Sequence, residues 1–155
     1  MKKLLVVLLA MIMVFSFAAC GGGGGEESAG DPNVISVENY EAEIVGWEIV
    51  KDSDDKDAIA VTFNWTNNGE DSQSFNWAFS FYFYQNGIEL DYAVVWVSED
   101  SYDTIDEGLS TNIQPGESLE VIATYELQDL ETPVDIEIGD LYQENVVTKT
   151  IDIAE

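Results

Sequence analysis

Carboxylates are the most numerous side chains of this chain that could do chemistry, since it carries 31 Asp and Glu residues but no His. Four of them fall within six residues, in the run Asp-Ser-Asp-Asp-Lys-Asp that begins at position 52. Ca²⁺ binds oxygen-rich loops of this kind, because it takes about six to eight oxygen ligands. The candidate metal ligands are therefore Asp52, Asp54, Asp55 and Asp57.

The spacing of these carboxylates departs from the helix–loop–helix calcium motif. Lys56 stands where that motif has its third ligand, and the glycine and distal glutamate of the motif are missing. We therefore interpret the run as a solvated turn whose like charges repel one another, with a Ca²⁺ site as the alternative. A second acidic group, at residues 99–107, lies in the longest predicted loop. Zinc is disfavoured, because the chain has no histidine and its one cysteine has another expected role.

The side chains that nucleophilic catalysis usually needs are missing. Without histidine there is no Ser–His or Cys–His pair, and the predicted domain has no Gly-x-Ser-x-Gly elbow and no phosphate-cradling glycine loop. Paired carboxylates could serve glycoside hydrolysis, but 31 acidic residues make close pairs inevitable. We expect that the protein is not an enzyme.

Aromatic residues offer a second kind of candidate site. Those on the apolar face of predicted strands are expected in the core: Trp65, Trp77, Phe79, Phe81 and Phe83. Other rings could stack on sugars or contact a partner protein. These candidate ligand-binding residues are Tyr82, Tyr84 and Tyr92 on an outer sheet face and Trp96 beside the acidic loop. The alternative is that these rings pair across neighbouring strands.

The first twenty residues have the organisation of a secretory signal. Met1-Lys2-Lys3 is positively charged, residues 4–17 are apolar or small, and Ala18-Ala19-Cys20 ends the segment. The apolar run is shorter than the roughly 20 residues that a membrane-spanning helix needs. A cleaved leader is therefore favoured over a retained membrane helix.

The end of the leader predicts a lipid anchor. Residues 17–20 are similar to the bacterial lipobox, in which the cysteine thiol receives diacylglycerol before the chain is cleaved. We therefore predict a signal peptide over residues 1–19 and lipidation of Cys20, the only cysteine. The alternative is an ordinary signal peptide that is cut nearby.

A linker and a strongly acidic domain are expected after the leader. Residues 20–33 are rich in glycine and have nothing to bury, so they are expected to form a flexible stalk that spans about 20 Å. Two of the five lysines belong to the leader, which leaves 31 acidic side chains against three lysines and no arginine. Nucleic acid is excluded as a partner, because affinity for phosphates comes from Lys and Arg.

The remainder, residues 34–155, has the pattern of one all-β domain. Apolar residues alternate with polar ones, which is typical of half-buried strands. Strands are predicted at residues 40–50, 59–66, 75–84, 119–127, 134–138 and 146–153, with residues 88–97 leading away from a hairpin and one helical turn within residues 98–107. Gly46 is a predicted β-bulge. Seven or eight short strands favour a two-sheet antiparallel sandwich.

The turns of this pattern resemble a known family. Their order is Thr66-Asn67-Asn68, then Gln85-Asn86-Gly87, then Pro115-Gly116-Glu117-Ser118 before a strand that ends in Tyr125-Glu126-Leu127. It is similar to a family of uncharacterised surface lipoproteins of Gram-positive bacteria, over roughly residues 34–138. The resemblance implies an immunoglobulin-like sandwich, similar to the fold of a secreted mycobacterial antigen. It also implies a cell-surface location, a binding or envelope role, and no catalytic residue.

Two functional hypotheses follow from the sequence. The first is a lipoprotein anchored to the extracellular face of a bacterial membrane, where it binds a protein, a peptide or a wall glycan. The second is an acidic envelope protein or spacer whose loops bind divalent cations such as Ca²⁺. No cofactor is expected apart from that cation.

Overall fold

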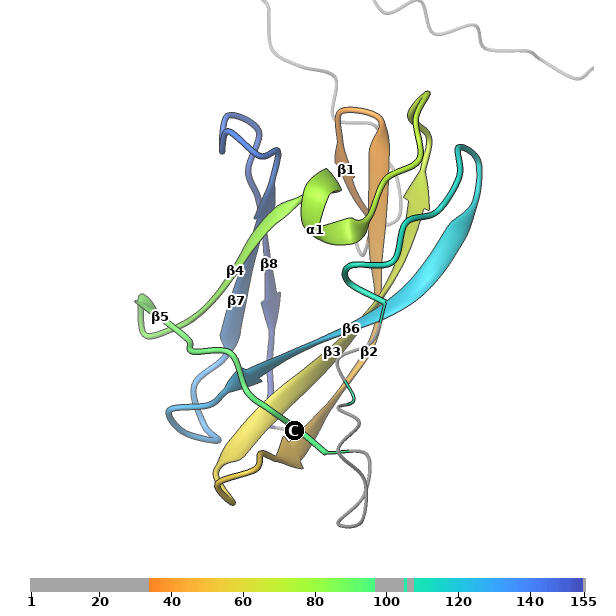
Figure 1. Cartoon of the computed structure of the whole chain (residues 1–155). Coiled ribbons are helices and arrows are strands. Elements are labelled where there is room, and N and C mark those ends of the chain that lie inside the picture. Colours follow the sequence, from red (N-terminus) through yellow and green to blue (C-terminus); the bar gives the residue numbers. More distant parts are fainter. Residues whose placement is uncertain (1–33, 97–104, 106–107, 155) are drawn as a thin grey trace, which may run out of the picture.

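The computed structural model describes residues 34–96, 105 and 108–154, and nearly all of their regular structure is β-strand (Figure 1). The elements are β1 (Val34–Val37), β2 (Tyr40–Lys51), β3 (Asp57–Asn67), α1 (Phe75–Ala78), β4 (Ser80–Gln85), β5 (Ile88–Glu89), β6 (Ser118–Glu126), β7 (Val134–Gly139) and β8 (Val147–Ile151). They form two antiparallel sheets, ordered β1-β2-β3-β6 and β5-β4-β7-β8. The predicted all-β, two-sheet sandwich is confirmed. Across the residues described, no helix has the length and apolar character of a membrane span.

The core lies between the two sheets, and β3 is its main contributor. Alternation along β3 points Ile59, Val61, Phe63 and Trp65 inward, and all four are fully buried. Strands β2 and β6 flank β3 on both sides. From the other sheet, Phe83 and residues 134, 136 and 138 pack against the same cluster. The period-two pattern therefore predicted this part of the core correctly.

A β-bulge changes which side chains of β2 face inward. Ile44 pairs with Phe63 and Gly46 with Thr62, so Val45 is an extra residue without a partner in β3. An extra residue reverses the alternation. Before the bulge Ala42 and Ile44 point to the inner face, and after it the odd-numbered residues do. The bulge predicted at Gly46 is confirmed.

Two predicted turns are also confirmed. Gln85 pairs with Ile88, and the two residues between them have positive φ (Asn86 52° and Gly87 73°), as the tight hairpin between β4 and β5 requires. The Pro115-Gly116 turn closes with a hydrogen bond from the Glu117 N–H to the Gln114 carbonyl (3.1 Å). The strand β6 begins directly after it.

The strand predicted at residues 75–84 is wrong in its first half, where the chain forms the helical turn α1. Phe75 and Phe79 are buried and pack on each other, with ring centroids 4.9 Å apart. A spacing of four residues places two side chains on one side of a helical turn as well as on one face of a strand. Trp77, between them, points away and is 67% exposed, so its predicted place in the core is also wrong.

The segment after β5 leaves its own sheet and joins the other one. The Ala93 N–H donates to the Thr124 carbonyl (3.0 Å), and the Glu126 N–H donates to the Asp91 carbonyl (2.8 Å). Ala93 and Val95 then pack against Ala58 in a small second cluster. Residues 91–95 therefore extend the sheet beyond the edge strand β6. The helical turn predicted within residues 98–107 lies largely outside the described residues.

Candidate functional site

The acidic run at residues 52–57 folds into a tight turn that uses its first carboxylate internally. Oδ1 of Asp52 accepts hydrogen bonds from the backbone N–H groups of Asp54 (2.9 Å) and Lys56 (2.8 Å). Asp52 is largely buried by this arrangement. Asp55 has a positive φ of 65°, which reverses the chain between these two donors. The carboxylate of Asp52 therefore stabilises the turn.

Two lysines at this turn form ion pairs with carboxylates. Nζ of Lys51 lies 2.8 Å from Oδ1 of Asp57, and Nζ of Lys56 lies 2.7 Å from Oε2 of Glu126. These hydrogen bonds to carboxylates raise the pKa of Lys51 and of Lys56 above the ordinary value. Asp54 and Asp55 point to solvent.

The predicted calcium ligands are therefore not brought together. In the part of the chain that the structure describes, no three acidic, histidine or cysteine side chains are arranged to hold a metal ion. The physical reason is that backbone N–H groups engage Asp52 and a lysine engages Asp57. Most of the second acidic group, at residues 99–107, and the predicted lipidation site Cys20 lie outside the described residues.

Tyr82 and Tyr84 lie on the outer face of β4, as predicted. Their ring centroids are 6.5 Å apart, and their cross-strand partners in β7 are Glu137 and Asp135. Partial desolvation and the nearby carboxylates of Glu137 and Glu89 raise the pKa of Tyr84 above its ordinary value. The two rings form a partly buried strip next to acidic side chains.

Tyr92 and Trp96 lie elsewhere, so the four predicted aromatic residues do not form one site. Tyr92 forms a β-bridge with Tyr125 of β6 and contacts its ring edge to face, with centroids 6.4 Å apart. Trp96 lies four residues further along the same segment and is partly exposed. Tyr92 lines a pocket.

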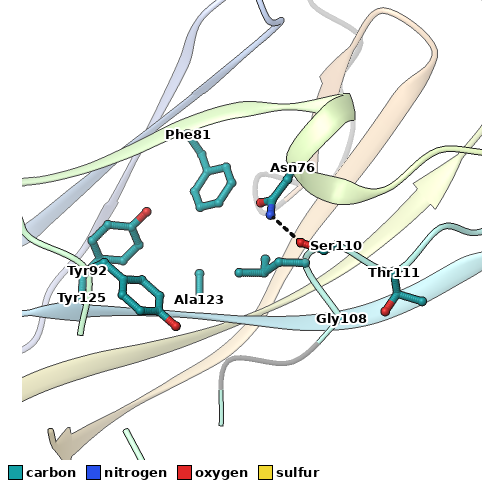
Figure 2. A pocket seen from close by; sticks show the side chains of 9 residues that line it. Asn76, Phe81, Tyr92, Gly108, Ser110, Thr111, Ala123 and Tyr125 are labelled. Atoms are coloured by element: carbon teal, nitrogen blue, oxygen red, sulfur yellow. Dashed lines mark hydrogen bonds between the residues drawn. The ribbon is translucent and has the colours of Figure 1, made fainter. Parts of the chain in front are cut away.

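This pocket, of about 380 Å³, opens between β4 and β6 on the side where β5 is only two residues long. Its apolar surface comes from the two strands and the segments beside them: Phe81, Tyr92, Leu109, Ala123 and Tyr125. Its polar surface comes from Asn76, Ser110 and Thr111. In Figure 2 the two tyrosines lie at one end of the pocket, and the hydrogen-bonded pair Asn76–Ser110 lies at the other. We call this cavity the β4–β6 pocket.

Tyr125 is held firmly at the aromatic end of the pocket. Its ring stacks on Phe83 of the opposite sheet, with centroids 4.0 Å apart and an angle of 14° between the planes. Burial raises the pKa of Tyr125 to about 12. The phenol therefore stays neutral at any physiological pH, and the floor of the pocket carries no charge there.

The helical turn α1 positions the polar end of the pocket. The Asn76 backbone N–H donates to the Leu109 carbonyl (3.0 Å), and Asn76 Nδ2 donates to Oγ of Ser110 (3.2 Å). These bonds hold the turn at residues 108–111 against α1. Sequence reasoning missed Asn76, because a continuous strand would have placed it on an outer face. The one signal in the sequence for a helical turn here is the spacing of four residues between Phe75 and Phe79.

Gly108 lets the turn approach β6 closely. Its φ is +78°, and a Cβ atom placed there would lie 2.9 Å from Cγ1 of Val121 and 3.2 Å from the Glu120 carbonyl. A side chain at this position would meet both a strained backbone and a filled space. The glycine therefore brings Leu109 and Ser110 to the pocket wall.

The chemistry of the pocket is that of neutral recognition. Among the described residues that line it, none carries a formal charge. Its aromatic rings offer flat apolar faces, and its amide and hydroxyl groups can donate and accept hydrogen bonds. Such a combination suits a ligand that has an apolar face and several uncharged polar groups.

Two solved structures of bacterial proteins are similar to this fold. A protein from Staphylococcus aureus subsp. aureus NCTC 8325, described provisionally as a lipoprotein, is 16% identical and superposes with a TM-score of 0.62 over 81% of this chain and 91% of the other. A protein from Enterococcus faecalis, solved by NMR, is 23% identical with a TM-score of 0.58 over 79% of this chain and 91% of the other. At these identities the likeness shows a shared fold. No curated protein matches the chain.

The sequence itself also matches a family model. The match covers residues 27–140, which is most of the chain and includes every element from β1 to β7. All residues that line the β4–β6 pocket fall within it. The chain therefore belongs to the family defined by the domain of unknown function DUF5067.

Proposed function

We propose that this protein is a lipid-anchored binding module on the extracellular face of a bacterial membrane, and that the β4–β6 pocket is its ligand site. The lipobox-like sequence before Cys20 supports the anchor, and the fold shared with a Staphylococcus aureus protein described provisionally as a lipoprotein agrees with it. The two-sheet architecture also agrees with an immunoglobulin-like relation for this sandwich.

The anchor can be tested on the whole chain expressed in a Gram-positive host. Because Cys20 is the only cysteine, Cys20→Ser should release the protein into the medium or leave it as uncleaved precursor. Fractionation followed by immunoblotting measures this. Mature protein that still needs detergent for release from membranes would contradict the anchor, and the binding role of the pocket would be unaffected.

We propose a neutral saccharide of the cell-wall glycan as the ligand class. The observation that carries this proposal is the pairing of aromatic faces with an uncharged polar rim in one pocket. Sugar rings have C–H faces that pack on aromatic rings, here on Tyr92 and Phe81, and their hydroxyl groups can bond to Asn76 and Thr111. Anionic ligands are disfavoured, because the residues after the leader carry 31 carboxylates against three lysines.

Calorimetric titration of the whole chain in nonionic detergent tests the ligand class. The probes are chitotriose, maltotriose and cellotriose. We expect saturable binding of at least one, and we expect Tyr92→Ala and Asn76→Ala to weaken it by about tenfold, as the loss of roughly 1.4 kcal/mol does. Tyr82→Ala is the matched control, because Tyr82 is a tyrosine on the outer face of β4 that does not line the β4–β6 pocket.

Two results would overturn the saccharide proposal. One is the absence of saturable binding for all three probes. The other is an equal loss of affinity in Tyr82→Ala and Tyr92→Ala, since that would place the sugar on the outer face of β4.

The alternative of a calcium-dependent spacer receives no support from the described acidic turn. The carboxylates of Asp52 and Asp57 already have partners there. This alternative now depends on residues 99–107, of which the structure describes only residue 105. We therefore keep the binding module as the proposed function.

A further inference from the structure

On the side of the sandwich away from the β4–β6 pocket, two strand edges have no neighbouring strand among the described residues. β1 pairs only with residues 40–43 of β2, so among the described residues no strand lies beside residues 46–51 on that side. β8 is the last strand of the other sheet. The two edges face each other across a cleft of about 420 Å³, lined by residues 44–47 and 149–152. We call it the β2–β8 cleft.

Apolar side chains reach this cleft from the inner face of β2. The bulge at Val45 turns Trp47 and Ile49 to the same face as their buried partners Val61 and Ile59. Yet Trp47 remains 39% exposed and Ile49 37% exposed. The reason is that β8 is the edge of the second sheet, so that sheet covers Trp47 and Ile49 only in part. The inner layer of the sandwich is therefore incomplete on this side.

Among the described residues, no strand pairs with the outer edge of β2 at residues 46–51. An edge strand presents unpaired N–H and C=O groups that can pair with another chain. Natural proteins usually blunt such edges with inward-pointing charges, with proline or with very short strands. β8 carries such a charge, because Lys149 lies between Val147 and Ile151 on its inner face. On the inner face of β2, Trp47 and Ile49 are apolar, and the charged Lys51 at the end of the strand is paired with Asp57. The stretch around Trp47 and Ile49 is therefore the more receptive edge.

We infer that the β2–β8 cleft receives an extended segment of a partner protein, which adds to the edge of β2 at residues 46–51. Six residues of strand extend about 20 Å, the usual length of a strand. Alternate side chains of the added segment would point inward onto Trp47 and Ile49 and complete the inner layer. This surface is separate from the proposed saccharide site, and the inference does not depend on that site.

Charge defines the kind of segment that fits. The outward position between Trp47 and Ile49 is Glu48, and the β8 wall of the cleft carries Asp152 as well as the inward-pointing Lys149. Outward side chains of the partner are therefore expected to be basic or polar, while inward ones are apolar. A second copy of this chain is the less suitable occupant, because its 31 acidic residues would repel those of the first copy.

The test uses a heptapeptide in which valine and lysine alternate, added to the whole chain in nonionic detergent at 150 mM NaCl. Amide hydrogen exchange followed by mass spectrometry is the readout. Strand addition should slow exchange at residues 46–51 by about tenfold or more, because edge amides become hydrogen-bonded. The control probe is the same peptide with every backbone nitrogen methylated, which keeps its charge and removes its N–H donors.

Matched variants locate the site. Ile49→Asn should abolish the protection, and Ile88→Asn should leave it unchanged, because Ile88 is an exposed isoleucine of β5 in the other sheet. Both changes leave the charge unaltered, and equal melting temperatures confirm that both variants fold. The inference is overturned if no protection appears at residues 46–51, if the methylated peptide protects equally, or if the two variants behave alike.

Discussion

The two open sides of the sandwich differ in what the chain adds to them. On the β4–β6 side, the segment at residues 91–95 extends the sheet beyond β6, and the turn at residues 108–111 is bonded to α1. These additions turn an opening into a pocket whose described lining residues carry no formal charge. On the β2–β8 side, the described residues add nothing beyond β1, which covers only one end of β2. That opening stays a cleft between two strand edges.

This difference suggests that the two sides recognise ligands in different ways. A pocket with fixed rings and hydrogen-bonding groups selects a small molecule by shape and by polar contacts. An open strand edge selects a polypeptide through its backbone and the alternation of its side chains. One small sandwich can therefore carry two sites that do not compete for the same residues.

The largest expected effect separates the closed centre of the molecule from its open edge. Trp65 and Trp47 point to the same inner face from neighbouring strands, but Trp65 is fully buried and packs edge-on against Phe75 and Phe79. We expect Trp65→Ala to lower the free energy of unfolding by about 3–5 kcal/mol. Trp47→Ala should cause a clearly smaller loss, because part of that ring is already in water. Urea unfolding of both variants measures the difference, and equal losses would mean that the cleft is closed.

The indole nitrogen of Trp65 gives this comparison a second control. Among the described residues, Nε1 of Trp65 is the buried side-chain nitrogen or oxygen without a hydrogen-bond partner. Burying such a donor costs about 1–3 kcal/mol. Trp65→Phe removes the donor and keeps most of the ring volume, so it should be far less destabilising than Trp65→Ala. A loss as large as that of Trp65→Ala would show that Nε1 has a partner.

An intermediate effect is expected at two glycines, one on each side. Gly108→Ala places a side chain at φ +78° and 2.9 Å from Val121, so we expect a loss of about 1–3 kcal/mol in unfolding free energy and weaker ligand binding in the β4–β6 pocket. Gly46→Ala should change stability by no more than about 0.5 kcal/mol, because its Cβ would meet no atom within 4 Å. Thermal unfolding of the two variants tests this order, and a larger loss for Gly46→Ala would contradict it.

Most of the fold could be predicted from the sequence because its strands keep a strict period of two. The core residues of β3, the bulge at Gly46 and the turn at Asn86-Gly87 each have a local cause that the sequence displays. The error at residues 75–78 also has a local cause. Phe75 and Phe79 satisfy the period of a strand and the spacing of a helical turn equally well. The helical turn is accompanied by contacts of both rings with residues distant in the sequence, such as Trp65, which the local pattern does not display.

The candidate site was less predictable, because it depends on contacts between distant parts of the chain. Tyr92 was predicted as a ligand-binding residue. Its place in the pocket, however, arises because the chain after β5 leaves the sheet of β4 and pairs with β6 of the other sheet. Asn76 and Ser110 are 34 residues apart, and nothing in the sequence links them. The density of carboxylates at residues 52–57 made a metal site one interpretation. The sequence does not show that the Asp52 carboxylate accepts hydrogen bonds from backbone N–H groups of its own turn.

The smallest expected effect concerns the turn that leads into β8 at the open side. The carboxylate of Asp140 accepts backbone N–H bonds from Glu144, Tyr142 and Asn145, and these bonds lower its pKa below the ordinary value of 3.8. A group whose pKa is lower in the folded state stabilises the fold above its unfolded pKa. That stabilisation is lost as the pH falls from about 4 through the folded pKa.

Asp140→Asn should therefore lower the melting temperature at pH 7 by a few degrees and have less effect near pH 3. Asp152→Asn is the matched control, because its carboxylate accepts one backbone bond, from the nearby Ala154. Melting temperatures between pH 2.5 and 7 measure the effect. A difference between Asp140→Asn and the unaltered chain that stays constant over this range would contradict the role of the ionised carboxylate.

Mapping a bound sugar on the protein shows whether the β4–β6 pocket is the ligand site. Backbone amide NMR signals of the whole chain in detergent micelles would be followed while the best-binding trisaccharide is added. We expect shifts concentrated at Asn76, Tyr92, Ser110 and Thr111, with no change at residues 46–49 of the β2–β8 cleft. Shifts centred on that cleft, or on Tyr82 and Tyr84 of the outer face of β4, would contradict it.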